Sequence, residues 1–227
     1  MGDEALREAK REARLEAAPF AAAMCAANVA LAVVSHRAGW ELFYRDDSWI
    51  WLAVGAPSLA LTATFAVGSL SPVLDHVSRE LAIVLLVLVG VGAAGGIACV
   101  VVSLLTSKPE ALHLLASAAV VLFTNVVSFS LFFWELDAGG PVARAMSGTR
   151  PHPDFRFTQD DNPQLARPGW APRLVDYAYV SVTNSLAFSP TDTMPLTRKA
   201  KLFMGMEAAI SFVTVLVVGA RAISVLS

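Results

Sequence analysis

Long apolar runs, separated by short charged stretches, make up most of the chain. Each run has roughly the 20 residues that an α-helix needs to cross about 30 Å of hydrocarbon. Charged residues stand between the runs and aromatic residues gather at several of their ends, as is typical at a membrane surface. The pattern predicts an all-α membrane protein with about five transmembrane helices, at residues 18–35, 49–70, 81–106, 111–136 and 202–226. Residues 18–136 would then form a four-helix transmembrane region.

The remaining segments have different patterns. Residues 1–17 mix five acidic with four basic side chains in a run of strong helix formers, which predicts a charged helix leading into the first span. Residues 137–173 are rich in proline, glycine and charged residues, and they predict a polar loop. Residues 174–188 are apolar but too short to cross the membrane, and Pro190 follows them. We therefore expect residues 174–227 to contain a short re-entrant or interfacial helix, a turn and the last span.

Composition supports the membrane assignment and excludes other classes. Of the 227 residues, 56% are apolar and 16% are charged, with a mean hydropathy of +0.58, whereas soluble proteins carry about 25% charged residues. The expected partner is the lipid bilayer, and a net charge of −2 gives no reason to expect nucleic acid. The histidines and cysteines are scattered, so the sequence predicts no metal site, no cofactor and no disulfide framework: His36, His76, His113, His152, Cys25 and Cys99.

Basic residues are distributed unequally between the two sides of the predicted topology. Thirteen fall on the side of the N-terminus and of residues 137–201, and four fall on the opposite side. Because lysine and arginine are retained preferentially in the cytoplasm, we expect a cytoplasmic N-terminus and an outside C-terminus.

Polar residues inside the spans are candidates for lining a pore or a substrate path. Asn125 lies in the fourth span and Glu207 near the start of the fifth. Each has a structural alternative, since Asn125 could hydrogen-bond to another helix and Glu207 could pair with Lys201 or reach the interface. In the third span, Gly92 and Gly96 form a small-xxx-small pair that permits close helix packing, within one chain or between copies.

The densest polar signal lies just before the last span, in residues 174–197. Thr183, Asn184 and Ser185 fall near the predicted deep end of the short helix, and Asp192 follows the proline break. Polar side chains at that depth are costly in lipid but useful in a wet cavity. We therefore expect these residues to line a polar path.

In order and spacing, this stretch is similar to the pore module of two-helix cation channels, in which an aromatic pore helix precedes a filter, an aspartate, a proline and the inner helix. The chain departs from that pattern at the filter, because no glycine occurs between Gly169 and Gly205. A ring of inward carbonyl groups needs residues that tolerate positive φ, so a potassium filter is excluded.

Several short motifs follow one another through the second half of the chain. They are Leu112-His113, Phe132-Phe133-Trp134, Gly139-Gly140, Asp176-Tyr177 after a proline-rich loop, the polar region at Thr183, and Arg198 before the last span. Together these motifs resemble a broad family of uncharacterised bacterial integral membrane proteins. The resemblance implies a location in the bacterial inner membrane, and it brings no substrate or active site.

Two functions fit these observations. The chain could be a channel or transporter subunit for a small ion or solute, with its path lined by residues 174–197. It could instead be a structural or assembly protein in which that segment lies flat at the interface and residues 137–173 bind a partner. An enzyme is not expected, because the spans hold no paired carboxylates and no nucleophile beside a base. Five spans enclose little space, so we expect a homo-oligomer, with the Gly92/Gly96 face as the candidate contact.

Overall fold

The apolar runs form long helices, because a helix satisfies its backbone hydrogen bonds internally, as a lipid environment requires. The computed structural model describes residues 2–40, 48–70, 79–106, 111–148, 150, 152–187 and 193–226. The charged leader and the first apolar run form one continuous helix that passes through Pro19. The long helices are α1 (Gly2–Ala38), α2 (Ser48–Leu70), α3 (Arg79–Thr106), α4 (Ala111–Leu136) and α8 (Arg198–Leu226).

The segment expected to be a polar loop is folded into short elements. Strands β1 and β2 pair in antiparallel fashion, with Phe155 opposite Pro195 and Phe157 opposite Thr193. This pairing ties the chain before α7 to the chain after it. The short elements are the 3-10 turn η2 (Asp137–Gly139), α5 (Pro141–Ser147), β1 (Phe155–Phe157), α6 (Thr158–Asp161), α7 (Leu174–Leu186) and β2 (Thr193–Pro195). We call η2, α5, β1, α6 and β2, with the loops that join them, the polar cap.

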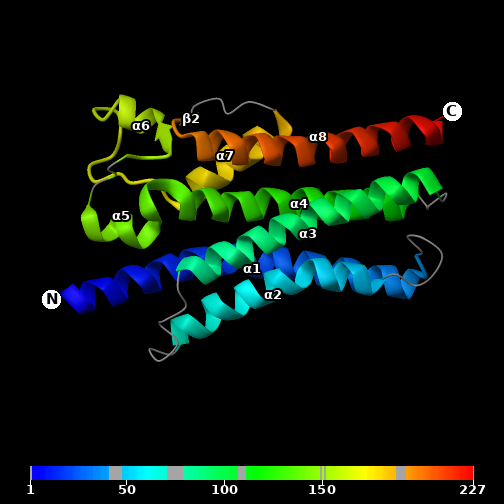
Figure 1. The fold of residues 1–227 in the computed structure, drawn as a ribbon, viewed down its shortest axis with the longest axis horizontal. Coiled ribbons are helices and arrows are strands. Elements are labelled where there is room, and N and C mark those ends of the chain that lie inside the picture. The colour runs from blue at the N-terminus through cyan, green and yellow to red at the C-terminus, as the bar shows by residue number, and fades with distance from the viewer. Residues whose placement is uncertain are drawn as a thin grey trace.

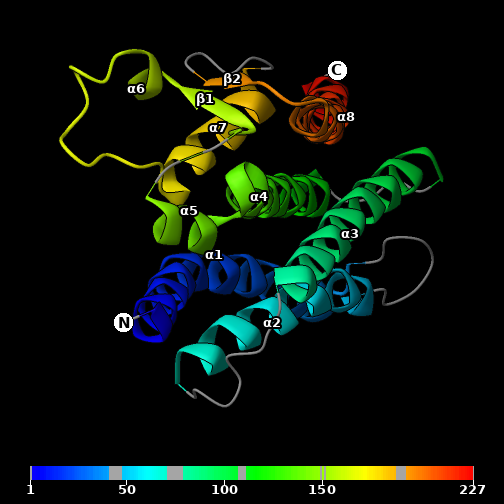
Figure 2. The same ribbon diagram turned by 60° about the vertical axis from the view of Figure 1, so that its left-hand side comes forward.

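Helix α4 is the centre of the bundle. It packs against α1, α3, α7 and α8, and Figures 1 and 2 show it between the layer of α1 and α2 and the layer of α7 and α8. Its C-terminal end carries large aromatic side chains into the junction with the polar cap. There Phe133 and Trp134 pack with Phe155, Leu174 and Tyr177, all of them buried. The core therefore joins the helical bundle to the polar cap.

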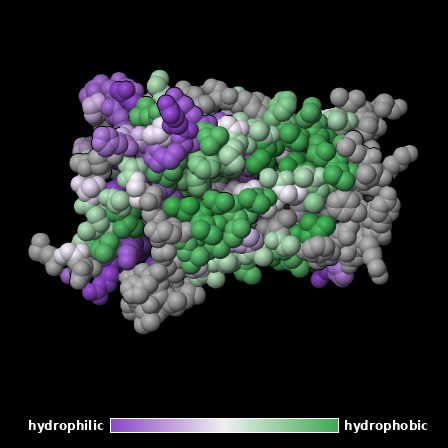
Figure 3. Space-filling view, in the orientation of Figure 1, coloured by the Kyte–Doolittle hydropathy of each residue, from purple (hydrophilic) through white to green (hydrophobic). Residues whose placement is uncertain are grey.

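Within the part of the chain that the structure describes, four helices are long and apolar enough to cross a membrane. Helix α2 contributes a shorter apolar stretch, Ile50–Phe65. On the face drawn in Figure 3, hydrophobic residues cover the middle, whereas hydrophilic residues gather over the polar cap and the start of α1. The predicted all-α class is thus confirmed, apart from the two short strands, with four helices able to span a membrane, and the fifth span remains a prediction. The four stretches are Glu4–Ala38, Leu81–Leu104, Leu112–Ser147 and Arg198–Ala220.

The two ends of the chain lie at opposite ends of the bundle. In Figure 1 the N-terminus and the polar cap are at one end, and the C-terminus is at the other. Helix α7 starts from the polar-cap end and runs along α4 and α8. The bundle thus has one end covered by folded polar structure, from which α7 extends.

Candidate functional site

A carboxyl group is buried in the bundle where α7 meets α8. Glu207 of α8 has no exposed surface, and three side chains of α7 donate hydrogen bonds to it. Asn184 Nδ2 lies 2.7 Å from Oε2. The hydroxyl groups of Ser181 and Ser185 both bond to Oε1, the latter at 3.1 Å. A carboxylate in such a place is costly unless its oxygens are hydrogen-bonded, and here both of them are.

Helix α4 closes the other side of this site. Asn125 Nδ2 donates to the main-chain carbonyl of Glu207 at 3.3 Å and to Ser211 Oγ at 2.9 Å. Ser181 Oγ lies 2.8 Å from the carbonyl oxygen of Val126. We call Asn125, Ser181, Asn184, Ser185, Glu207 and Ser211 the Glu207 cluster. It joins three helices through buried polar side chains.

One oxygen of the Glu207 cluster has no partner. The side chain of Asn125 is fully buried, and within the described part of the chain its Oδ1 accepts no hydrogen bond. Buried acceptors are rarely left unpaired in proteins, so this oxygen calls for a donor or a cation. No lysine, arginine or histidine among the described residues pairs with Glu207, and the expected partner Lys201 is exposed.

Sequence spacing explains why α7 presents three polar groups together. Ser181, Asn184 and Ser185 are three or four residues apart, and such residues share one face of a helix. The N-terminal end of α7 is fixed by two carboxylates. Asp176 Oδ2 accepts the amide of Arg173 at 2.7 Å, and Glu16 Oε1 of α1 accepts the amide of Leu174 at 2.6 Å. These groups satisfy amides that a helix leaves unpaired at its start.

The opposite face of α7 is apolar. Val175, Tyr179, Val182 and Leu186 are exposed, the first of them by 63%. A helix lying on a membrane surface turns its polar face to water and its apolar face to the membrane interior. Helix α7 instead buries its polar face against α4 and α8 and exposes the apolar one. This is the pattern of a helix whose outer face contacts lipid.

The structure brings together four of the six residues predicted to line a path. Asn125, Asn184, Ser185 and Glu207 belong to one cluster. Thr183 does not, because it is half-buried and its hydroxyl bonds to the carbonyls of Tyr179 and Val180 in its own helix. Asp192 lies outside the described residues. Sequence reasoning missed Ser181 and Ser211, although each stands four residues from a predicted member, Ser185 and Glu207 respectively.

Other polar and small residues of the spans hold helices together. Asn28 of α1 donates to Thr124 Oγ1 of α4 at 3.0 Å. Gly96 of α3 is buried, and a Cβ atom placed on it would lie 3.2 Å from Val121 of α4 and 3.5 Å from Trp51 of α2. Gly92 is half-buried. Gly96 therefore allows α3 to pack closely on α4 and α2 of the same chain. The predicted contact of the Gly92/Gly96 face between copies of the chain stays a prediction.

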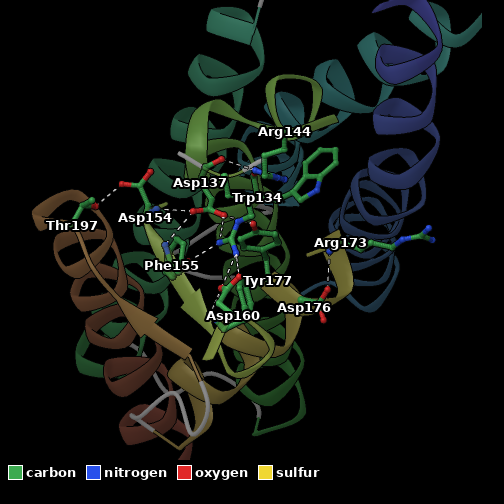
Figure 4. Close-up of polar contacts among 12 residues, drawn as sticks. Trp134, Asp137, Arg144, Asp154, Phe155, Asp160, Arg173, Asp176, Tyr177 and Thr197 are labelled. Carbon is green, nitrogen blue, oxygen red and sulfur yellow. Dashed lines mark hydrogen bonds and ion pairs between the residues drawn. The ribbon is translucent and has the colours of Figure 1, made fainter. Parts of the chain in front are cut away.

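A second polar network lies where α4 enters the polar cap (Figure 4). Asp137 has no exposed surface, and its carboxylate accepts hydrogen bonds from two side chains and two amides. Tyr177 OH lies 2.6 Å from Oδ2 and Arg150 Nη2 lies 2.8 Å from it. The amides of Asp154 and Phe155 lie 2.7 Å and 3.1 Å from Oδ1. Asp137 therefore joins α4, β1 and α7.

Burial and the neighbouring charges shift the pKa of two groups in this network, Tyr177 and Arg150. Burial raises the pKa of the Tyr177 hydroxyl well above its usual range, so it remains a donor to Asp137. Burial by itself lowers the pKa of Arg150, but the attraction of Asp137 and the hydrogen bonds outweigh it and the pKa is raised. Arg150 also bonds to Asp160 through Nη1, at 2.8 Å and 3.0 Å. Both oxygens of the Asp137 carboxylate are hydrogen-bonded and Arg150 contacts two carboxylates, and these charge-assisted bonds hold the junction in place.

No metal centre was found in the part of the chain that the structure describes, where no three His, Cys, Asp or Glu side chains lie close enough to hold an ion. Cys25 and Cys99 are not joined to one another. Comparison of the chain with family models, with curated proteins and with solved structures found no match. The argument for function therefore depends on the two polar networks and on the bundle that holds them.

Proposed function

We propose that the chain is a subunit of a membrane channel or transporter for a small cation, with the Glu207 cluster as the binding site on its path. One observation carries the proposal. Three side chains from a helix shorter than a membrane span converge on a buried carboxylate of α8. Ionisable residues inside membrane helices are rare and expensive, and they usually belong to ion pathways or proton relays.

The placement of α7 supports a re-entrant segment. The helix has 13 residues, or about 20 Å at 1.5 Å per residue, which is too short to cross the hydrocarbon. The paired strands β1 and β2 bring the chain back to the polar cap after α7. Its exposed face is apolar and its buried face is polar. Such broken segments occur in transporters where they line a binding site near the middle of the membrane.

The chemistry of the Glu207 cluster favours a cation over an anion. A carboxylate, serine hydroxyls and the unpaired Asn125 Oδ1 all present oxygen atoms, which are the ligands of small cations. A single carboxylate balances one positive charge. We therefore infer a monovalent cation, which includes the proton, as the transported species.

We also propose how the helices are arranged across the membrane. Helix α2 serves as the fifth span, which places the N-terminus and the polar cap on one side and the C-terminus on the other. The excess of basic residues assigns the polar cap to the cytoplasm. The protein would lie in the bacterial inner membrane, with copies of the chain associating to enclose the path.

A structural role is the alternative, and one observation favours it. Within the described chain both carboxylate oxygens of Glu207 already have donors, so the cluster could simply fasten α7 to the bundle. Neutral polar groups in membrane helices commonly act in that way. In this case the protein would carry no flux, and its polar cap would bind a partner.

Flux measurements separate the two functions. The purified chain is reconstituted in liposomes, and the entry of Na⁺, K⁺ and H⁺ is recorded for wild type and for the Glu207→Gln and Asn184→Leu variants. We expect wild-type flux of a monovalent cation and at least a tenfold loss in both variants. Thr214→Val is the matched control, because Thr214 is buried two turns beyond Glu207 on α8 and, among the described residues, its hydroxyl bonds to the carbonyl of Ile210 in its own helix. Absence of wild-type flux, or flux that is unchanged in both variants, would contradict the proposed site and favour the structural role.

A further inference from the structure

A groove of about 390 Å³ lies beside the first half of α1, and none of its lining residues belongs to the Glu207 cluster. In Figures 1 and 2 this half of α1 lies between α5 and the end of α2, and α1 packs against both helices. The start of α3 and the end of α4 complete the groove. Its volume falls within the roughly 300–1,000 Å³ of small-molecule sites.

The charged residues at the start of α1 are separated onto two sides of the helix. Lys10 and Arg14 are four residues apart, so they share one side, and both line the groove. Glu12 and Glu16 are also four residues apart, and they line a different cleft, which includes the loop that leads into α7. Among the described residues that line the groove, Glu135 is the one carboxylate, and it balances one of the two bases. The groove therefore keeps a net positive charge.

The other walls of the groove are largely apolar and lie deeper in the membrane. Phe65 and Ala82 line it from inside the apolar runs of α2 and α3, near the polar-cap ends of these runs. Arg14 and Lys10 precede the first apolar run, which begins at residue 18, by about 6 Å and about 12 Å of helix. The groove thus crosses the level at which hydrocarbon gives way to lipid head groups, with its apolar walls inside that level and its bases outside it.

We propose that the groove binds an anionic phospholipid, with the lipid phosphate at Lys10 and Arg14 and an acyl chain along Phe65. An acyl chain needs an apolar wall within the hydrocarbon, and an anionic head group needs cations just outside it, as in other basic pockets between membrane helices. Both basic side chains are half-buried, and such side chains cover apolar surface with their stems while their charges reach the head groups. A soluble anion would not use the apolar walls, and a zwitterionic lipid brings its own positive charge. The proposal is independent of transport through the Glu207 cluster.

Lipid titrations test the site in the full-length protein, purified in a neutral detergent. Short-chain phosphatidylglycerol is compared with short-chain phosphatidylcholine at constant detergent concentration and ionic strength. Native mass spectrometry counts the bound lipids, and the midpoint of thermal unfolding reports their affinity. We expect saturable binding of phosphatidylglycerol with a raised midpoint, and at least tenfold weaker binding of phosphatidylcholine. Equal binding of the two lipids, or no saturable binding of phosphatidylglycerol, would overturn the proposal.

A pair of charge variants separates a site from general attraction to the start of α1. Arg14→Gln should weaken the binding of phosphatidylglycerol at least tenfold. Arg11→Gln should change it less than twofold, because Arg11 is exposed on the same helix but does not line the groove. Equal losses in the two variants would show that the lipid responds to the charge of the whole segment, and would contradict a site in the groove.

A second pair of variants fills the groove without changing its charge. Ala143 and Ala145 are both exposed on α5, but Ala143 lines the groove and Ala145 does not. Ala143→Trp should weaken lipid binding at least tenfold, whereas Ala145→Trp should bind as wild type does, and this pair decides if Arg14→Gln does not fold. An Ala143→Trp protein that binds lipid normally but has lost a wild-type dimer would assign the groove to a second copy of the chain. Lipid binding is measured without transport, so an absence of flux leaves this test intact.

Discussion

Asp137 is the residue through which the polar cap is attached to the bundle. Its buried carboxylate joins the end of α4 to β1 and, through Tyr177, to α7. Tyr177 stands one turn before Ser181, the first α7 residue that contacts Glu207. The orientation of α7 against α8 therefore depends on contacts made at both of its ends.

Replacing Asp137 should loosen the polar cap. Asp137→Asn removes the charge that balances Arg150 and leaves a buried guanidinium short of its partner. We expect a loss of about 3 kcal/mol in the free energy of unfolding, which is typical of breaking a buried ion pair. Titration with a denaturing detergent would measure it. Asp161→Asn is the control, because Asp161 pairs with Arg156 on the surface, where such pairs contribute at most about 1 kcal/mol. Equal losses in the two variants would contradict the role given to Asp137.

At the scale of elements, helices α7 and α3 differ in what their buried residues do. Helix α7 turns polar side chains inward, where they bond to Glu207, and exposes Val175 and Leu186. Helix α3 is apolar throughout and packs closely on its neighbours at Gly96. The first arrangement supplies a candidate site and the second supplies only packing.

A larger side chain at Gly96 should disturb the packing of α3 on α4 and α2. Gly96→Leu places new atoms against Val121 and Trp51, and overpacking of this kind costs about 1–3 kcal/mol. Gly95→Leu is the control, since a Cβ atom at Gly95 has nothing within 4 Å. The two variants are compared by unfolding in denaturing detergent. If wild type proves to be an oligomer and Gly96→Leu is a stable monomer, this face would instead lie between copies of the chain.

Among the described residues, hydrophilic side chains gather at the polar-cap end of the molecule, and hydrophobic ones cover the middle of the face drawn in Figure 3. The N-terminus and the polar cap share the polar end, and the C-terminus lies at the opposite end (Figure 1). We expect such a molecule to insert in a membrane in one direction. The count of basic residues predicts that the polar cap faces the cytoplasm.

Labelling of the chain ends tests this orientation. Cysteines are introduced by Gly2→Cys and Ser227→Cys in a chain in which Cys25 and Cys99 are replaced by alanine. A thiol reagent that does not cross membranes should label intact cells at residue 227 and should label residue 2 only after lysis. The reverse result would overturn the orientation. Labelling at both ends in intact cells would contradict the odd number of spans.

The amino-acid sequence alone determined the long helices of this protein and four residues of its candidate site. A run of apolar residues long enough to cross a membrane has few alternatives to a helix, because unpaired backbone groups are too costly in lipid. The expected limits of α3 and α4 therefore agree with the structure to within two residues. Four of the six candidate path residues, Asn125, Asn184, Ser185 and Glu207, lie in one cluster for a related reason, since polar groups in apolar surroundings must find each other.

Only the tertiary structure decided which partners those groups have. Glu207 could pair with Lys201 by sequence distance alone, yet it bonds to α7, because that helix packs on the buried face of α8 whereas Lys201 is exposed. The polar cap depends in the same way on contacts such as Asp137 with Tyr177, which are 40 residues apart. Hydropathy along a chain reports how apolar each position is, but hydrogen bonds depend on distance and direction in space. For that reason four of the six residues of the Glu207 cluster could be predicted from the sequence, and their connections could not.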